Sequence, residues 1–559
     1  MDLGNFLFVS SLASTAMLLS GIAIGRKELS KLLDYYVRTP FFFVAIGSMA
    51  FFASFALFFV SNVEQLYFDE NIYVGVALNI LHNLNEDWCQ FGTGLLRNCY
   101  IQQHYHDPTG WSFFIAIAFL LFGPSNATAS YAELFSGTMC ILLIYFVSSL
   151  LFEDPKKGAF SSLLLAFTPS MFIWSRTIAD TDVPLLMFTL LSIFFFLVYS
   201  KTRKNGILLA FLSSLLLAAN TRIEGLLAAL ILLVSFFFFG KKGIRKNIKS
   251  NLKFLARSVD EDLRFLVVIL VGALVFSPIA AMFAKDLATQ SYGQPSSTGT
   301  FNFAYFSSNA NGILSYLEGE TDSISYYPSI FPQDYRLLAV FGILVLIASE
   351  KEKAPAIFLL LWFASFFIFY SFYYAGSPYY GVDSRFMLQI TPQIVIVASL
   401  TLSFLYEVPK GRVKKALFAS LVFFSLVFIP FLSYAKIITV KPSGMPQQYQ
   451  IHDVMQFFYS NYSRVPRSCL VFSFTPDIWY LSNYSSAQIG YLGVQNESIE
   501  KIEKNFPCYV LDYGYWCTVP PYQSTTCAIE MHDYVSGSIV NETSQNGEEI
   551  GFFYLNLSK

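Results

Sequence analysis

Charged residues are scarce in this 559-residue chain, where Asp, Glu, Lys and Arg together make up 13% and histidine occurs five times. Hydrophobic residues make up 55%, with 60 Phe and 34 Tyr. A soluble protein cannot cover so much apolar surface with so few charges. The composition therefore excludes soluble, collagen-like, disordered and disulfide-scaffold classes, and it predicts a polytopic protein embedded in a lipid bilayer.

Several sequence motifs are also missing. The chain has no Walker loop, no glycine-rich dinucleotide fingerprint after a strand, no HExxH motif, no paired CxxC and no evident repeat of 20–50 residues. ATP-driven transport and zinc hydrolysis therefore have no support. The formal net charge is −2, which indicates no nucleic-acid partner.

Long apolar runs predict about twelve membrane crossings. These runs lie at about 5–25, 41–60, 128–152, 159–175, 183–200, 206–221, 225–240, 265–284, 336–349, 354–374, 386–406 and 416–438. A further run, 111–123, is short for a full crossing, so twelve and thirteen helices both remain open.

The distribution of basic residues predicts the orientation. Seven Lys and Arg residues between positions 241 and 257 mark a cytoplasmic loop, and smaller basic loops are expected on the same side. The opposite side then receives the first outer loop, 61–110, the long loop 285–334, and the tail. We expect a cell-membrane protein with an extracytoplasmic site, the endoplasmic reticulum membrane being the alternative.

The tail, residues 439–559, has ordinary polarity and short strand-like runs at 469–474, 508–513 and 551–555. These features predict a small extracytoplasmic α/β domain after a membrane domain that spans 1–438. Asn-x-Ser/Thr sequons in the tail indicate a face where N-glycosylation occurs, and four are taken as candidate sites: Asn461, Asn483, Asn496 and Asn541. Six of the seven cysteines fall on the predicted outer side, which favours disulfides over free thiols, and Cys89–Cys99 is the best single pair.

Ionisable residues gather at the predicted outer ends of the membrane runs. Asp69 and Glu70 begin a segment with helical apolar spacing, which we interpret as a helix along the membrane interface, and helix capping is the alternative reading. Four further groups belong to this set. One group is His104, His106 and Asp107, which precede Pro108, and another is Arg176, Asp180 and Asp182 in "SRTIADTD". The last two are Arg222 and Glu224 in "NTRIEG", and Asp383 and Arg385 in "GVDSRFML".

In this order the motifs resemble those of the GT-C glycosyltransferases, membrane enzymes that use polyprenyl-phosphate sugars. The closest likeness is to the branch of the protein O-mannosyltransferases and aminoarabinose transferases, and it covers roughly residues 40–405. The resemblance implies an all-α polytopic membrane domain of GT-C type with about 12–13 transmembrane helices. It also implies transfer of a sugar from a polyprenyl (dolichyl) phosphate to an acceptor, which is a glycan, a protein or a lipid.

The resemblance also implies roles for individual residues. Asp69 would be the general base, and Glu70 and Asp107 would orient the acceptor or the sugar. The lipid phosphate would bind Arg385 and Arg222, with Arg176 a further candidate. His104, His106 and Glu224 would contact the acceptor or the sugar, and the long loop, with Glu318 or Glu320, would cover the site. No metal is expected to be obligatory, although Asp180 and Asp182 would suit a divalent cation such as Mg or Mn.

Two motifs instead look like those of the oligosaccharyltransferase catalytic subunit. "SRTIADTD" is similar to its second acidic motif, and "VLDYGYW", with Asp512, Tyr513 and Gly514, resembles its Trp-Trp-Asp-Tyr-Gly signature with both tryptophans replaced. Transfer of a lipid-linked oligosaccharide to Asn is therefore the alternative function. A secondary transporter or a non-catalytic receptor has less support, because the charges lie at span ends and no paired halves are visible.

Overall fold

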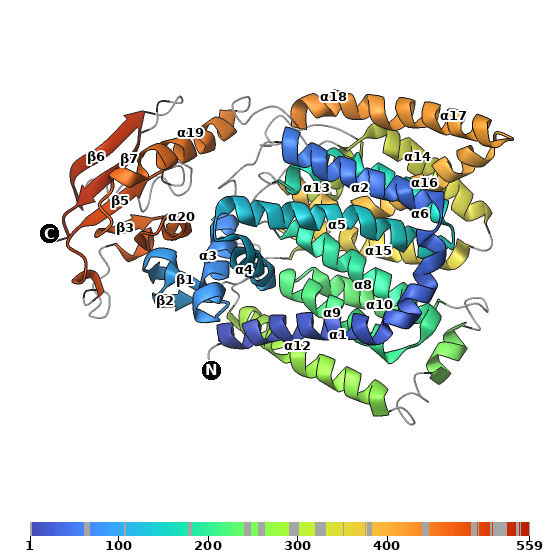
Figure 1. Cartoon of the computed structure of the whole chain (residues 1–559), viewed down its shortest axis with the longest axis horizontal. Coiled ribbons are helices and arrows are strands. Elements are labelled where there is room, and N and C mark those ends of the chain that lie inside the picture. The colour runs from blue at the N-terminus through green and yellow to red at the C-terminus, as the bar shows by residue number, and fades with distance from the viewer. Residues whose placement is uncertain are drawn as a thin grey trace.

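Apolar helices from the first three quarters of the chain pack side by side into a bundle, and a sheet lies at one end of that bundle (Figure 1). The computed structural model describes residues 3–60, 68–104, 108–176, 181–239, 247–254, 263–289, 301–318, 331–349, 352–374, 376, 383–438, 446–492, 500, 502–514, 517, 534–543, 547 and 549–557.

The bundle begins with α1 (Leu3–Val37), α2 (Pro40–Phe59), α3 (Phe68–Asn83), α4 (Gly110–Phe122), α5 (Asn126–Phe152), α6 (Pro155–Ala166) and α7 (Pro169–Trp174). It continues with α8 (Asp182–Thr202), α9 (Asn205–Thr221), α10 (Gly225–Phe236), α12 (Leu263–Thr289) and α13 (Phe306–Leu317). The last elements are α14 (Gln333–Ala348), α15 (Lys353–Phe372), the 3-10 segment η4 (Asp383–Gln389), α16 (Thr391–Glu407), α17 (Arg412–Phe423), the π segment η5 (Phe424–Phe428) and α18 (Ile429–Ile438).

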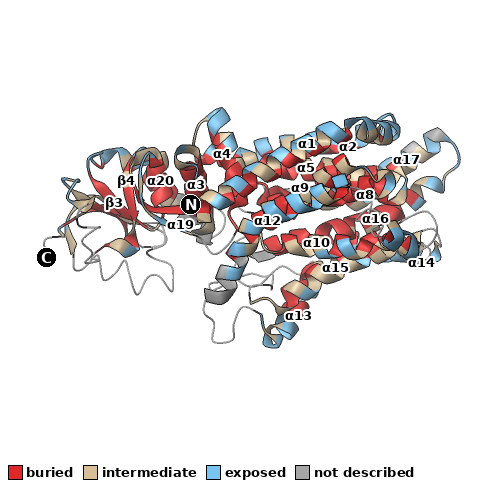
Figure 2. Cartoon of the chain, turned by 90° about the horizontal axis from the view of Figure 1, so that it is seen from below, coloured by how far each residue is buried: buried red, intermediate tan, exposed pale blue. Residues whose placement is uncertain are grey.

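Seven of the described helical segments are long and apolar enough to cross a membrane, and four shorter apolar helices accompany them. Helices such as α8 are buried within the bundle, whereas α12 and α17 turn apolar side chains outward (Figure 2). Outward apolar faces suit lipid rather than water. The prediction of a mostly helical, multi-pass membrane domain is confirmed.

Two apolar runs depart from the expected simple spans. The run 159–175 divides into α6 and α7, because Pro169 cannot continue the hydrogen bonding of the preceding helix. The short run near 111–123 forms α4, whose 13 residues rise about 20 Å, less than the ~30 Å of a bilayer core.

Ion pairs gather at the end of the bundle that lies away from the sheet. Lys156 and Lys415 both bind Glu407 at the end of α16, and Lys201 binds Glu153. The described lysines of three predicted cytoplasmic loops therefore lie at one end of the bundle. That this end faces the cytoplasm stays a prediction.

The sheet has seven strands in the order β2-β1-β4-β3-β5-β7-β6. The strands are β1 (Trp88–Gly92), β2 (Cys99–Gln103), β3 (Leu470–Ser473), β4 (Ser485–Gln488), β5 (Tyr509–Tyr513), β6 (Val535–Thr543) and β7 (Glu549–Leu555). The central strands β4, β3 and β5 are parallel, and the outer pairs are antiparallel. Three strands agree with the strand-like runs of the tail, which also holds α19 (Pro446–Asn461) and α20 (Pro476–Leu481).

The sheet joins two distant parts of the sequence. The hairpin β1–β2 comes from the first loop, and β1 pairs with β4 of the tail through Phe91–Ala487 and Gly92–Ser486. The expected domain boundary at residue 439 stays a prediction, but the sheet itself crosses it. The tail is therefore bonded directly to the segment that carries Asp69 and Glu70.

Helix α3 is buried on nearly all sides. Every residue from 70 to 80 is buried. The reason is that the tail covers it: Gly75 lets Trp88 approach so closely that a Cβ would stand 3.0 Å from the indole ring, and Asp477 of α20 lies next to it. The prediction of a helix is confirmed, and its place along a membrane interface stays a prediction.

Disulfides hold both parts of the sheet. The predicted Cys89–Cys99 bond closes the β1–β2 hairpin and is confirmed. A second disulfide, Cys469–Cys508, joins the segments that precede β3 and β5. The buried Cys140 of α5 is the free cysteine of the described residues.

The candidate glycosylation sites differ in exposure. Asn483 and Asn541 are exposed. Asn461 is 3% exposed, and its amide nitrogen donates to the carbonyl of Phe457. Asn496 lies outside the described residues.

Glycan occupancy tests these differences. We expect N-glycans on Asn483 and Asn541 and none on Asn461, because a glycan on its amide would break a buried hydrogen bond and has no room. Mass spectrometry of glycopeptides from a host that N-glycosylates secreted domains measures each site. A glycan on Asn461 would contradict the packing, and bare Asn483 and Asn541 would argue against an extracytoplasmic tail.

Candidate active site

Five charged side chains from four parts of the chain converge at the sheet end of the bundle. We call them the charge cluster: Asp69 of α3, Asp182 of α8, Arg222 and Glu224 between α9 and α10, and Arg385 of η4. The cluster has two arginines and three carboxylates, and it therefore carries one net negative charge.

Arg222 is the most tightly held member. Its Nη1 lies 3.0 Å from Oδ2 of Asp182, and its Nε and Nη2 each lie 3.1 Å from an oxygen of Glu224. The carboxylates of Asp182 and Glu224 are 1% and 2% exposed. A guanidinium between two buried carboxylates is already fully paired. Arg222 is therefore suited to holding the turn after α9 against α8, rather than to binding a ligand.

Arg385 has longer ion pairs than Arg222 with the carboxylates of the cluster. Its Nε lies 3.6 Å from Oδ2 of Asp182, and its Nη2 lies 3.9 Å from Oδ2 of Asp69. Both distances exceed those of hydrogen-bonded ion pairs, which are about 2.7–2.9 Å. Arg385 thus connects Asp69 to Asp182 through longer ion pairs than those of Arg222.

Asp69 is the accessible carboxylate of the cluster. It lies in the first turn of α3, and its side chain is 32% exposed. Its neighbour Glu70 is buried. A general base must reach a substrate proton, so accessibility favours Asp69 over the buried Asp182 and Glu224.

Aromatic and amide side chains complete the surroundings. The ring centroid of Phe386 lies 5.0 Å from the guanidinium carbon of Arg222 and 5.2 Å from that of Arg385. The ring of Tyr370 stacks on the ring of Phe386, with 5.2 Å between their centroids. Gln389 donates to the carbonyl of Asp182 at 2.8 Å. Tyr370, Phe386 and Gln389 were not among the predicted site residues, although Phe386 and Gln389 closely follow Arg385 in the sequence.

Other predicted residues lie elsewhere or cannot be placed. Arg176 donates to Ser130 and faces the ring of Tyr131, both on α5, so the structure does not join it to the charge cluster.

The remaining predicted residues are the histidines, the carboxylates outside the charge cluster and the loop glutamates. His104 pairs with Asp87 at 3.6 Å. His106, Asp107, Asp180 and Glu320 are outside the described residues. Glu318 lies 3.8 Å from Arg336, away from the cluster.

The structure offers no ready-made metal site among the residues it describes, where no three His, Cys, Asp or Glu side chains converge to hold an ion. In the expected acidic pair, Asp182 directs Oδ2 at both Arg222 and Arg385, while Asp180 is not described. A divalent cation at Asp182 would have to compete with two guanidinium groups.

An apolar groove lies beside the charge cluster. It is bounded by α14, α15 and α16, has a cavity volume of about 690 Å³, and is lined almost entirely by aliphatic side chains, several of which are on the surface of the bundle. Gln393 lies in its wall and donates to the carbonyl of Gln389, which in turn donates to Asp182. Two hydrogen bonds therefore connect the wall of the groove to the backbone of Asp182 in the charge cluster.

A buried carboxyl group, Glu86, lies in the first loop behind the cluster. It is 0% exposed, and its backbone N–H donates to the carbonyl of Gly4 in α1. Burial raises the pKa of Glu86 to about 8, with a further contribution from Asp87, while the nearby hydroxyl groups of Ser11 and Thr109 act in the opposite direction. Ser11 also accepts from Asn220, two residues before Arg222.

Comparison with known proteins agrees with this geometry. Residues 106–281 match the model of the dolichyl-phosphate-mannose-protein mannosyltransferase family. The chain is similar in structure to ArnT from Cupriavidus metallidurans bound to undecaprenyl phosphate, with a TM-score of 0.56, 11% identity, and coverage of 93% of this chain and 98% of that one.

It is also similar to the archaeal oligosaccharyltransferase AglB from Archaeoglobus fulgidus in complex with an inhibitory peptide and a dolichol-phosphate. That match has a TM-score of 0.52 at 14% identity, over 93% of this chain and 75% of that one. No curated protein matches the sequence. The chain therefore has the GT-C fold, and the expected likeness to the mannosyltransferase and aminoarabinose-transferase branch is confirmed.

The unequal pairing of the two arginines predicts unequal losses of stability. Arg222→Met should lower the midpoint of thermal unfolding in detergent far more than Arg385→Met, because it leaves Asp182 and Glu224 buried without their closest cation, at a cost of about 3–5 kcal/mol. Adding Glu224→Gln to Arg222→Met should recover part of the loss. Equal losses for the two single variants would contradict this assignment.

The buried Glu86 predicts a pH dependence of stability. From pH 4.5, its ordinary pKa, to about pH 8, the unfolded chain ionises Glu86 while the folded protein keeps its proton. Stability should therefore fall as pH rises through this window, by about 1.4 kcal/mol per pH unit for this group. Glu86→Gln should flatten the profile and raise the unfolding temperature at pH 8. An unchanged slope in this variant would contradict the assignment.

Proposed function

We propose that this protein is a membrane glycosyltransferase that moves a sugar from a polyprenyl phosphate to an acceptor hydroxyl on the extracytoplasmic face. The observation that carries the proposal is the convergence of an accessible carboxylate, Asp69, with the guanidinium of Arg385, in a bundle that also has an apolar groove. Asp69 would accept the proton of the acceptor hydroxyl, and Arg385 would bind the phosphate of the lipid. The groove would hold the isoprenoid chain.

The donor would lie with its chain in the groove and its phosphate at Arg385. The groove is apolar and long enough to run from Arg336 at one end to Lys353 at the other. The structures of ArnT and AglB named above contain undecaprenyl phosphate and dolichol-phosphate, which supports a lipid of this class. The guanidinium would neutralise the charge that the phosphate gains when the glycosidic bond breaks.

Asp69 would act as the general base. The acceptor oxygen attacks the anomeric carbon, its proton passes to Asp69, and the bond from the anomeric carbon to the phosphate oxygen breaks with inversion. Polyprenyl phosphate leaves with the electron pair. A phosphate is a good leaving group without strong acid catalysis, so the reaction needs no metal in this scheme, and Asp182 already faces two arginines.

Oligosaccharide transfer to Asn is the second candidate. Its support is the likeness to AglB over 93% of this chain and the position of Asp512 and Tyr513 at the end of a central strand of the tail. That reaction would use a diphosphate-linked oligosaccharide. We favour the first proposal, because the family model that matches is that of the mannosyltransferases.

The test is transfer from a panel of radiolabelled polyprenyl-phosphate sugars by the purified full-length protein, with and without EDTA. Wild-type protein should transfer a monosaccharide in EDTA. Asp69→Asn should lower the rate by roughly 10²–10⁴-fold while donor binding is kept, since it removes only the base. Arg385→Ala should instead weaken donor binding.

The outcomes separate the candidates. Asp69→Asn with near wild-type turnover would remove Asp69 from catalysis. Lost turnover at unchanged donor affinity in Arg385→Ala would argue against a phosphate contact. Transfer that is sensitive to EDTA and requires a diphosphate-linked oligosaccharide would favour the second candidate.

A further inference from the structure

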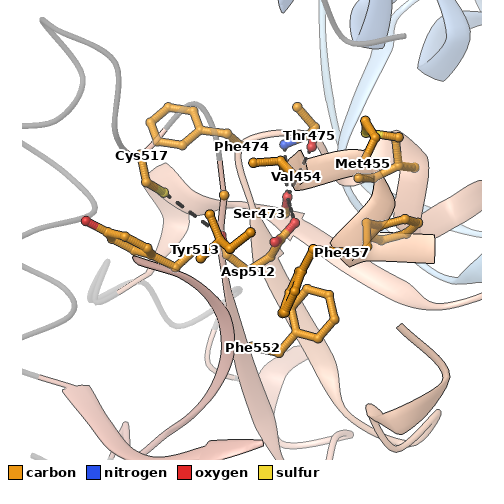
Figure 3. A pocket seen from close by; sticks show the side chains of 14 residues that line it. Val454, Met455, Phe457, Ser473, Phe474, Thr475, Asp512, Tyr513, Cys517 and Phe552 are labelled. Carbon is orange, nitrogen blue, oxygen red and sulfur yellow. Dashed lines mark hydrogen bonds between the residues drawn. The ribbon is translucent and has the colours of Figure 1, made fainter. Parts of the chain in front are cut away.

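The two ends of strand β5 differ in the space beside them. At the carboxyl end, Asp512 accepts a hydrogen bond from the hydroxyl of Ser473 (Figure 3) and another from the indole N–H of Trp479, each at 2.8 Å. The cavity there is about 30 Å³, roughly the volume of one water molecule in the liquid. It therefore has no room for a larger ligand.

The opposite end of β5, at Tyr509, opens into a groove of about 680 Å³. This volume lies in the range of small-molecule sites. We call it the tail groove, and its lining includes Glu500, Glu503, Ser536, Gly537, Tyr554 and Asn556.

A sequon lies in the lining of the tail groove. Asn556 is followed by Leu557 and Ser558, which completes an Asn-x-Ser sequence. Asn556 is exposed and lines the groove, whereas the exposed Asn483 and Asn541 do not line it. A glycan attached to Asn556 would therefore begin inside the groove.

Tyr554 lies two residues before the sequon asparagine. The backbone N–H of Asn556 donates to the carbonyl of Tyr534 at 2.9 Å, so the extended pairing of β7 with the start of β6 continues to this residue. Side chains two residues apart in an extended strand point to the same face. The half-buried ring of Tyr554 therefore lies beside the base of such a glycan.

Gly537 leaves open space next to this ring. It pairs with Tyr554 across β6 and β7, and residues paired in this way present their side chains on one face. A Cβ at Gly537 would meet no atom within 4 Å beyond its chain neighbours, and its φ is outside the left-handed region. The position therefore supplies space, since its backbone conformation does not require glycine.

The chemistry of the tail groove suits a sugar. The C–H face of a pyranose ring is apolar and packs on an aromatic ring such as that of Tyr554. The hydroxyl groups of a sugar need hydrogen-bond acceptors, which the carboxylates of Glu500 and Glu503 supply. One aromatic surface and several polar groups therefore lie around the sequon.

We propose that Asn556 carries an N-glycan whose first sugar packs on the ring of Tyr554, in the space above Gly537. In the attachment, the amide nitrogen of Asn556 bonds to the anomeric carbon of a lipid-diphosphate-linked oligosaccharide. The bond from that carbon to the phosphate oxygen breaks, and the lipid diphosphate leaves with the electron pair while the amide proton passes to solvent. The inference rests on the extracytoplasmic placement of the tail in the proposed function, and not on sugar transfer at the charge cluster.

The test is the rate at which peptide N-glycanase releases each glycan from the folded, full-length protein in detergent. The protein is made in a eukaryotic host, and chymotryptic peptides separate Asn556 from Asn541 for mass spectrometry. Release in H₂¹⁸O marks each freed asparagine. Because the first sugar is packed on Tyr554, release at Asn556 should be about 5-fold slower than at Asn541. The two rates should become equal after denaturation.

Four variants examine the packing. Tyr554→Ala removes the ring and Gly537→Val fills the space, so each should raise the release rate at Asn556 to that at Asn541. Tyr554→Phe keeps the ring and should keep the protection. Tyr100→Ala, at an exposed tyrosine on the other edge of the sheet, should leave the ratio unchanged. If Tyr554→Ala does not fold, Gly537→Val still decides.

Three results would overturn the proposal. A bare Asn556 beside glycosylated Asn483 or Asn541 rejects the modification. Equal release at Asn556 and Asn541 in the folded protein rejects the packing, and so does slow release that persists in Gly537→Val. Bare asparagines at all three positions reject the extracytoplasmic tail together with this site.

The result is distinguishable from failure of the proposed reaction. A protected glycan on Asn556 in a protein that transfers no sugar would support the glycan site and count against the reaction at the charge cluster. Transfer of sugar by a protein with a bare Asn556 would do the reverse.

Discussion

The shared carboxylate of Asp182 is the interaction on which the candidate site depends. Its Oδ2 faces Arg222 at 3.0 Å and Arg385 at 3.6 Å, so one buried oxygen joins α8, the turn between α9 and α10, and η4. Through Arg385 the same network reaches Asp69 on α3. Because charges buried in a bundle must be paired, these pairs determine how four distant segments approach one another.

The two arginines of the network differ in how closely they pair with carboxylates, although both lie at the ends of predicted spans in the sequence. Arg222 forms close ion pairs with Asp182 and Glu224, whereas Arg385 lies 3.6 Å from Asp182 and 3.9 Å from Asp69. The composite sheet adds a second constraint. It bonds the first loop to the tail and places α20 over α3, so the position of Asp69 is coupled to the folding of residues more than 400 positions later in the chain.

Much of this could be predicted from the sequence, because local patterns carry it. The apolar runs predicted the helices, the acidic start of α3 was visible in "FDENIY", and two cysteines ten residues apart predicted the hairpin disulfide. Local sequence patterns could not show which arginine pairs most closely with carboxylates, because this depends on Glu224 folding back onto Arg222. They also could not show that Arg176 turns to α5, or that α3 is covered on its outer side.

The sequence alone determined that this is a multi-pass membrane protein, where most of its apolar helices and three of its strands lie, and that its rare charges gather at the ends of spans. These properties follow from composition and periodicity, which act over a few residues. Only the tertiary structure decided which charges meet, which one stays accessible, and that the first loop and the tail share a sheet. Those outcomes depend on contacts between segments far apart in the chain, where the cost of burying an unpaired charge or an unpaired strand edge selects one arrangement.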